Sequence, residues 1–258
     1  MTGFLNSDFP VSYMKPKIGF STGAFYTWYP DVNEQISLIR KLKVKAIELS
    51  FINLEELNTN ISEQNIKYLK SISYVSLHAP IFDSSREKIT FGKDNGIVKK
   101  LSDLYRKINA KTVVFHPDTV KDWDLISNFG MEVSVENLPI EDNFNNNKLA
   151  GLFKIHPEFS LVLDTAHAFS YNPSTLQKYM RLYKNRICHV HFSDRRFSKS
   201  KGKQHDHEQF LFCRDRKKFE AIRTLSCPII IEISVKDKKY DLANIHDEID
   251  SVQDFLSR

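Results

Sequence analysis

Histidine and carboxylate side chains recur at the carboxyl ends of short apolar runs in this 258-residue sequence. In SLVLDTAHAF, residues 160–169, the apolar run ends in Asp164, and His167 follows three residues later. Similar runs end in His78, His116, Glu136, His191 and Glu232. Burying such groups is costly unless they are paired, and a divalent cation would pair with both imidazoles and carboxylates. Neutral imidazoles combined with carboxylates suit zinc or manganese, so the pattern predicts a metal centre.

The prediction rests on the set of residues and not on any one of them. A single histidine of this kind is more often a hydrogen-bonded core residue than a ligand. A chance recurrence at six successive runs is improbable. Three carboxylates gathered in one pocket would also repel one another without a metal.

A further pair of candidate ligands, His205 and His207, lies in KGKQHDHEQF, after the run that ends in His191. On an extended segment, both rings of a His-x-His sequence point the same way, which makes a usable ligand pair. A polar surface loop is the alternative interpretation. Because the other candidates converge nearby, the ligand interpretation is favoured.

Basic residues crowd a short segment beside this pair: Arg195, Arg196, Lys199, Lys201 and Lys203. The net charge of +5 permits an acidic partner without demanding one. A solvated surface is the usual explanation of a charge run alone. Next to a candidate metal centre, however, the segment suits contacts to phosphate groups.

The elements that must position these side chains alternate between strand and helix. Short, nearly continuously apolar strands are expected at residues 17–22, 46–51, 74–80, 112–118, 132–137, 160–167, 187–194 and 228–234. Helical or partly helical segments separate them, and such strands are typical of a parallel sheet buried on both faces. Eight βα units in about 250 residues predict a TIM barrel, in which strand ends converge on one mouth. We expect one domain over residues 1–258, with a polar leader at residues 1–16.

An open, doubly wound α/β sheet is the alternative fold. Such a sheet usually carries a glycine-rich phosphate turn after its first strand. The corresponding segment here, FSTGAFY, has no GxGxxG sequence, and the whole chain contains only 8 glycines. The barrel is therefore favoured.

The cysteines and the apolar runs indicate in which cellular compartment the protein resides. Three cysteines without CxxC spacing indicate reduced thiols inside a cell. The start of the sequence does not resemble a signal peptide, and no apolar run approaches a membrane span. We expect a cytoplasmic protein with no membrane partner and no evident need for a protein partner.

The motifs LHAP, VFHPD, SVEN, LDTAHAF, HFSD, HDH and IIEIS together resemble the endonuclease IV family, within the xylose-isomerase-like TIM barrels. The resemblance runs from Leu77 to Glu232. It implies a DNA-repair hydrolase that cleaves damaged double-stranded DNA 5′ to abasic sites by metal-activated hydroxide attack, with the abasic nucleotide flipped into the pocket.

The resemblance also implies up to three zinc ions, or manganese in their place. His78 and His116 would hold the first ion, and Glu136 would bridge it to the second. Asp164, His191 and Glu232 would complete the second site, and His167, His205 and His207 would hold the third. We hypothesise that Glu136 and Glu232 also have a catalytic role, in positioning the hydroxide.

Four features depart from the family pattern. His205 stands where the family usually has an aspartate, and the glycines that typically follow the pair are missing. Ile81 and Phe82 occupy the positions of the residues that normally wedge into DNA, and they are apolar enough to serve. The front loop that normally enters DNA is not recognisable here.

A metal-dependent sugar isomerase or epimerase of the same superfamily is the alternative function. Such an enzyme holds one metal with a quartet that would be Glu136, Asp164, His191 and Glu232. It has no need of ligands at His78, His116, His205 and His207, which a trinuclear phosphodiesterase requires. A non-catalytic nucleic-acid binder would need neither set.

Overall fold

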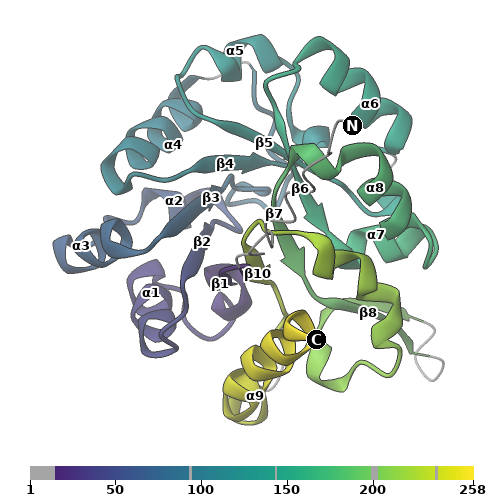
Figure 1. Cartoon of the computed structure of the whole chain (residues 1–258). Helices are drawn as coiled ribbons and strands as arrows, with labels where there is room; N and C mark the ends of the chain where they lie inside the picture. Colours follow the sequence, from purple (N-terminus) through teal and green to yellow (C-terminus); the bar gives the residue numbers. More distant parts are fainter. Residues whose placement is uncertain (1–14, 93–94, 143, 199–202, 236–237) are drawn as a thin grey trace, which may run out of the picture.

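Eight parallel strands close into a barrel in the order β1-β10-β7-β6-β5-β4-β3-β2 (Figure 1). The barrel strands are β1 (Ile18–Ser21), β2 (Ala46–Ser50), β3 (Tyr74–His78), β4 (Thr112–Phe115), β5 (Val133–Glu136), β6 (Ser160–Asp164), β7 (Ile187–Phe192) and β10 (Ile229–Ile231). Each falls within one of the eight ranges expected from the sequence. The predicted TIM barrel is therefore confirmed.

The computed structural model describes residues 15–92, 95–142, 144–198, 203–235 and 238–258. Most of the expected polar leader, residues 1–14, lies outside the described residues. Lys199 and Lys201 of the basic segment lie outside them as well.

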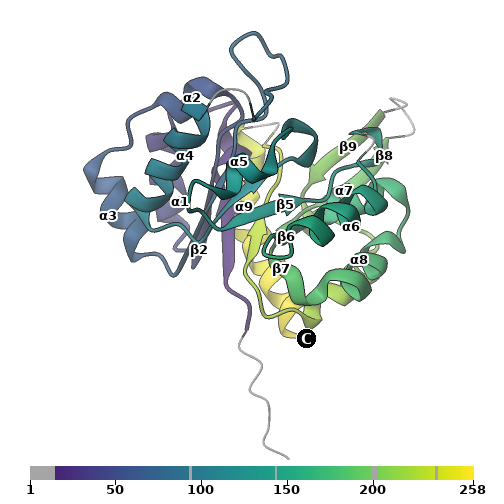
Figure 2. The same cartoon turned by 90° about the horizontal axis from the view of Figure 1, so that it is seen from above.

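Helices surround the barrel on its outer side (Figures 1 and 2). The α-helices are α1 (Val32–Lys41), α2 (Leu54–Asn58), α3 (Glu63–Ser71), α4 (Asn95–Ile108), α5 (Trp123–Ser127), α6 (Asn146–Ile155), α7 (Thr165–Tyr171), α8 (Thr175–Tyr183) and α9 (Lys238–Ser257). The 3₁₀ helices are η1 (Thr22–Phe25), η2 (Pro117–Thr119), η3 (Ile140–Asp142), η4 (Lys184–Arg186), η5 (Phe210–Phe212) and η6 (Arg216–Thr224). Among the described residues, no helix is both long enough and apolar enough to traverse a bilayer.

Short polar side chains start several of these helices. The side chain of Asp31 accepts a hydrogen bond from the backbone N–H of Asn33 at 2.8 Å and caps α1. The side chains of Ser62 and Asn145 cap α3 and α6 in the same manner. Each cap satisfies backbone donors that the first turn of a helix leaves without intrahelical partners.

The strands are buried on both faces, because helices cover the outside and side chains fill the lumen. Every residue of β2, β4 and β5 is buried. Polar side chains nonetheless occur within this buried sheet. Glu48 of β2 pairs in register with Ser76 of β3, and Ser50 pairs with His78 two residues further along. The lumen is thus polar toward the carboxyl ends of these strands.

A separate antiparallel hairpin follows β7 and consists of β8 (Asp194–Ser198) and β9 (Lys203–Glu208). Figure 2 shows it projecting beyond the barrel next to α7. Asp194 pairs with Glu208 and Arg196 with His205, so the register shifts by one residue between the two pairs. His207 lies at this bulge and has a left-handed backbone, with φ of 55°.

The C-terminal helix α9 anchors the segment that follows the hairpin. The two carboxylate oxygens of Glu248 accept hydrogen bonds from the backbone N–H groups of Phe210 and Leu211, each at 2.7 Å. The Glu248 side chain is fully buried. The start of η5, three residues after His207, is therefore fixed to α9.

Candidate metal centre

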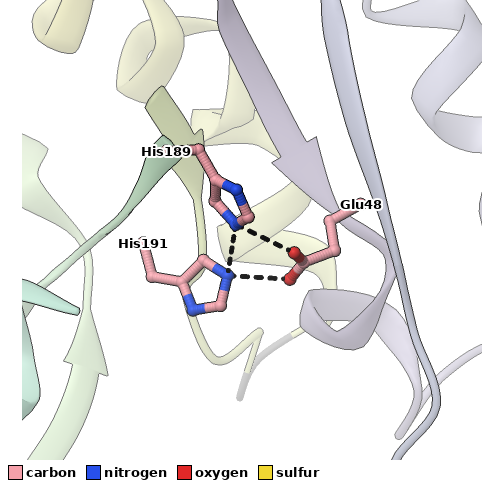
Figure 3. Close-up of side chains that lie close together, drawn as sticks. All are labelled: Glu48, His189 and His191. Atoms are coloured by element: carbon pink, nitrogen blue, oxygen red, sulfur yellow. Dashed lines mark hydrogen bonds and ion pairs between the residues drawn. The ribbon is translucent and has the colours of Figure 1, made fainter. Parts of the chain in front are cut away.

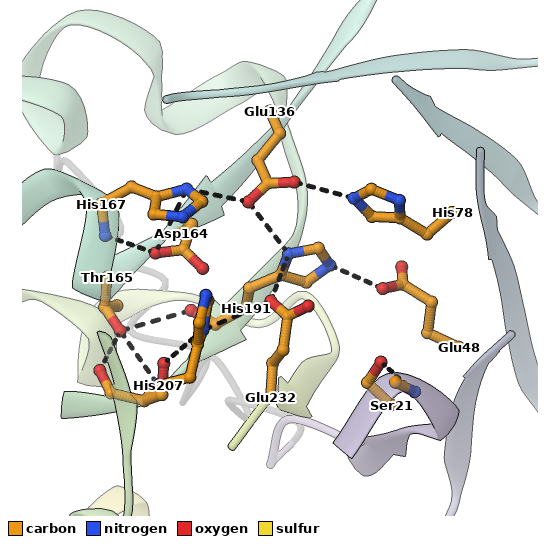
Figure 4. Close-up of polar contacts among 12 residues, drawn as sticks. Ser21, Glu48, His78, Glu136, Asp164, Thr165, His167, His191, His207 and Glu232 are labelled. Atoms are coloured by element: carbon orange, nitrogen blue, oxygen red, sulfur yellow. Dashed lines mark hydrogen bonds and ion pairs between the residues drawn. The ribbon is translucent and has the colours of Figure 1, made fainter. Parts of the chain in front are cut away.

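Four groups of His, Asp and Glu side chains in the described part of the chain bring ligand atoms within 4.8 Å of one another. The first group is His78, His116 and Glu136, the central group is Glu136, Asp164, His191 and Glu232, the third group is Asp164, His167 and His207, and the inner group is Glu48, His189 and His191. Figure 4 shows how members of all four groups lie next to one another. Most of them come from the carboxyl ends of barrel strands.

Glu136, the last residue of β5, connects the groups. Its Oε2 atom lies 3.0 Å from Nε2 of His78 and 3.2 Å from Nε2 of His116. Its Oε1 atom lies 3.1 Å from Nδ1 of His167 and 3.4 Å from Nδ1 of His191. Burial by itself would raise the pKa of Glu136, but the neighbouring histidines, His191 and His116 above all, hold it well below its ordinary value. This carboxylate is therefore ionised and has histidine nitrogens on both sides.

The His78 ring has a defined orientation. Its Nδ1 atom lies 2.9 Å from the carbonyl oxygen of Ala79, which can only accept a hydrogen bond, so Nδ1 carries a proton. Nε2 then faces Oε2 of Glu136. An unprotonated nitrogen and a carboxylate oxygen would repel each other there unless a proton or a metal ion lies between them. The pair thus has the geometry of two ligands with an oriented imidazole.

Asp164 and His167 are held together by the start of α7. Asp164 ends β6 and caps α7, and its Oδ1 atom accepts a hydrogen bond from the backbone N–H of His167 at 2.5 Å. The Asp-x-x-His spacing in the sequence is thus the spacing of an N-cap residue and a residue in the first helical turn. Burial raises the pKa of Asp164 to about 6. For His167, burial lowers the pKa, but Asp164 and Glu136 outweigh it and raise the value to about 10.

Asn137, directly after Glu136, holds this corner of the site. Its side chain donates to the carbonyl of Asp164 at 2.9 Å and accepts from the N–H of Asp164 at 2.8 Å. Its own carbonyl oxygen lies 3.0 Å from Nδ1 of His167. Asn137 is the last residue of the sequence motif SVEN. Membership of this motif did not predict that Asn137 positions Asp164 and His167.

Three buried ligand atoms in the central group have no hydrogen-bond partner among the described residues: Oδ2 of Asp164, Nδ1 of His191 and Oε2 of Glu232. Nδ1 of His191 lies 3.0 Å from Oε2 of Glu232, yet the two atoms do not form a hydrogen bond. Burial would raise the pKa of Glu232, but His191 lowers it to about 2. Buried polar atoms normally have partners, so atoms without one that lie around a common point fit a cation there. The residues present therefore suit a divalent metal such as zinc or manganese.

His207 joins the third group, whereas His205 belongs to none of the four groups. The bulge in β9 and the left-handed backbone of His207 break the period-two alternation between the two residues. Of the expected ligand pair, only His207 thus reaches one of the groups. The backbone N–H of Ser234 donates to the carbonyl of His207 at 2.8 Å and places it beside the end of β10. Asp164 takes the place in the third group that the sequence assigned to His205.

The two residues expected to wedge into DNA lie at the mouth of the barrel. Ile81 and Phe82 line a cavity of about 270 Å³ together with members of the first, central and third groups. Phe82 is 36% exposed, whereas Ile81 is half-buried. Both residues thus lie beside the candidate metal centre.

The basic segment is placed only in part. The Arg195 side chain is 6% exposed and pairs with Glu141 at 2.7 Å and with Asp206 at 3.0 Å. Arg196 is partly exposed and pairs with Asp194 at 3.5 Å. Arg195 therefore links β8 to β9 and to η3, whereas Arg196 pairs within β8. The backbone of Lys203 begins β9, but its side chain lies outside the described residues.

The inner group was not predicted from the sequence. Glu48 lies in the middle of the β2 run AIELS, so it escapes a search for polar residues at strand ends. A charged residue within an otherwise apolar buried strand is the signal that could have revealed it. Burial would raise the pKa of Glu48, but His191 and His189 hold it well below its ordinary value.

Comparison with known proteins finds the same barrel in solved structures of several kinds. Endonuclease IV from Thermus thermophilus has 14% sequence identity and a TM-score of 0.61, over 93% of this chain and 100% of that chain. A xylose isomerase domain protein from Planctomyces limnophilus has 12% identity and a TM-score of 0.62, over 95% and 96% of the two chains. D-allulose 3-epimerase from Methylomonas sp. has 15% identity and a TM-score of 0.58, over 95% and 96%.

No protein-family model and no curated protein sequence matches the chain. The likeness to solved structures is therefore one of fold. The chain shares its barrel fold with an endonuclease, a xylose isomerase domain protein and a sugar epimerase.

Proposed function

We propose that the chain is a metal-dependent phosphodiesterase that cleaves DNA 5′ to abasic sites, as its resemblance to the endonuclease IV family implies. The observation that carries the proposal is the shared position of Glu136, which belongs to both the first and the central group. A carboxylate that offers one oxygen to His78 and the other to His191 suits a bridge between two metal ions. Phosphodiester cleavage is one of the reaction classes that use such paired ions.

The chemistry divides between the metals and the chain. Bound metals would lower the pKa of water and offset negative charge on the phosphate and the leaving oxygen. Glu136 and Glu232 hold ionised carboxylates at the cavity and would orient the attacking water. His78, His116 and His207 line the same cavity and complete the outer ligand positions.

The partner in this proposal is damaged double-stranded DNA. Ile81 and Phe82 at the cavity rim would contact the bases next to an extruded abasic nucleotide. Because Arg195 and Arg196 already pair with carboxylates, we assign them to holding the hairpin, with phosphate contact a secondary role.

A sugar isomerase or epimerase is the second candidate. The central group alone supplies the Glu, Asp, His and Glu quartet that such an enzyme needs around one metal. The fold likeness to D-allulose 3-epimerase supports this candidate as well. It leaves the first and third groups without a role, and for this reason we rank it second.

Cleavage of a duplex oligonucleotide with a single abasic analogue tests the proposal. Wild-type protein of counted metal content should cut 5′ to the lesion, lose activity with a chelator and regain it with zinc or manganese. A duplex with an ordinary base at the same position is the control. No incision by protein that holds a single metal would contradict the proposal and favour the isomerase.

Glu232→Gln provides the matched variant. Loss of the carboxylate charge at the cavity should abolish cleavage and leave binding to the abasic duplex largely intact. Loss of folding instead, seen as a lost cooperative melting transition, would show that Glu232 has a structural role.

A further inference from the structure

Glu48 lies fully buried behind the central group, on β2. Its Oε1 atom lies 2.9 Å from Nε2 of His191, and its Oε2 atom lies 3.2 Å from Nε2 of His189 (Figure 3). The opposite ring nitrogen of His191, Nδ1, faces Glu136 and Glu232. His191 therefore spans the distance between the inner group and the central group.

The side chain of Glu48 faces Nε2, one of the two ring nitrogens of His191. Oε1 of Glu48 makes no hydrogen bond among the described residues, although Nε2 of His191 lies only 2.9 Å away. A buried carboxylate oxygen without a partner is strongly unfavourable. A proton on Nε2 of His191 removes this cost, and a neutral ring then keeps a lone pair on Nδ1.

The remaining contacts of the inner group agree with this assignment. The Ser76 hydroxyl donates to Oε2 of Glu48 at 2.9 Å. The Tyr74 hydroxyl lies 2.8 Å from Nδ1 of His189. Nε2 of His189 lies 3.3 Å from Nε2 of His191 and forms a hydrogen bond with it (Figure 3), so one of these two nitrogens donates and the other accepts. With the proton of His191 on Nε2, Nε2 of His189 accepts, and the proton of a neutral His189 lies on Nδ1 and faces the Tyr74 hydroxyl.

We propose that Glu48 is a positioning residue, which keeps the proton of His191 on Nε2 and so presents the Nδ1 lone pair to a metal in the central group. The inference rests on the metal centre of the proposed function, and it adds a residue that touches neither metal nor substrate. A carboxylate behind a ligating histidine fixes the ring and increases its basicity as a ligand.

Nitrogen NMR of the wild-type protein tests the assignment without any substitution. In zinc-loaded, ¹⁵N-labelled protein, long-range ¹H–¹⁵N correlations of the His191 ring should show the proton on Nε2 and zinc on Nδ1. A proton on Nδ1, or zinc bound at Nε2, would overturn the proposal.

Zinc affinity of Glu48→Gln provides the second test. The variant keeps the shape of the side chain and removes its charge, so zinc should bind the central group about 10- to 100-fold more weakly. Ser76→Ala is the control, because it removes a hydrogen bond to Oε2 and leaves Oε1 and His191 in place. Unchanged affinity in Glu48→Gln would count against the proposal. A zinc ion located between Glu48 and His189 would do so too, since Glu48 would then be a ligand.

The outcome can be separated from that of the proposed function. Wild-type protein that binds zinc but leaves abasic DNA intact would refute the substrate and leave the role of Glu48 standing. Cleavage of abasic DNA by Glu48→Gln, with wild-type zinc affinity, would refute the role of Glu48 and leave the substrate standing.

Discussion

Oε2 of Glu136 lies 3.0 Å from Nε2 of His78, and both side chains are buried. The other oxygen of Glu136 faces His167 and His191, so one carboxylate serves two groups. His78 belongs to the first group alone. The two residues therefore differ in how many metal ions should depend on them.

Glu136→Gln and His78→Asn test this difference. The glutamine should lose more than one zinc ion per chain and all cleavage, because the bridge between two groups is removed. The asparagine should lose one zinc ion. Elemental analysis of dialysed, folded protein measures both, and equal losses in the two variants would contradict a shared carboxylate.

His205 and His207 make a matched pair for the third group. Only His207 lies within ligand distance of Asp164 and His167. His207→Ala should therefore lose one zinc ion, and His205→Ala should keep the wild-type zinc content. Loss of zinc from His205→Ala alone would contradict the third group as described. It would instead support the ligand role that the sequence predicts for His205.

Phe82 is expected to act at the lesion. Phe82→Ala should weaken binding to an abasic duplex by about tenfold, the scale of one lost stacking contact. Binding to an intact duplex should change less, because no gap is present for the side chain to fill. Fluorescence anisotropy in the Glu232→Gln background measures both without cleavage. Leu182→Ala, which changes an exposed residue of α8, is the control. An equal loss of affinity for both duplexes in Phe82→Ala would refute the wedge role.

Glu248 should make stability depend on pH. Burial raises its pKa to about 7 from an ordinary value of 4.5. The folded protein thus holds this proton more tightly than the unfolded chain does. The resulting stabilisation is complete below pH 4.5 and is lost as the pH rises through 7.

Glu248→Gln cannot ionise and should lack this dependence. The free energy of unfolding of the wild type, relative to the variant, should fall by about 1–3 kcal/mol between acidic and mildly alkaline solution. Urea unfolding of both proteins at several pH values measures the difference. Parallel profiles would mean that Glu248 keeps an ordinary pKa in the folded protein.

The barrel could be predicted from the sequence because its strands are short, apolar and regularly spaced. Strands such as β4 and β6 are buried on both faces, and their nearly continuous apolar sequence indicates this. The hairpin β8–β9 could not be predicted in this way. Its charged residues show no apolar alternation, and backbone pairing and ion pairs such as Arg195–Asp206 hold it together.

The candidate ligands at strand ends could be named from the sequence because a parallel barrel brings those ends together. The charge of Glu48 within an apolar run marks it as unusual, but its role could not be predicted, since that role depends on a neighbour from β7. The relation of His205 to His207 also escaped, because a bulge changes the direction of side chains without changing their spacing in the sequence. The local sequence pattern predicts which segments form strands. It does not predict the direction of side chains where a strand is distorted by a bulge.

His207 differs from the other members of the first, central and third groups in its origin, since it comes from the hairpin β8–β9 and the others come from the barrel and the start of α7. The barrel could close and assemble the first and central groups without the hairpin. The third group is thus modular: changes in the hairpin would alter the nuclearity of the centre without disturbing the scaffold. A single barrel of this design could give rise to mononuclear and polynuclear enzymes by exchanging one surface appendage.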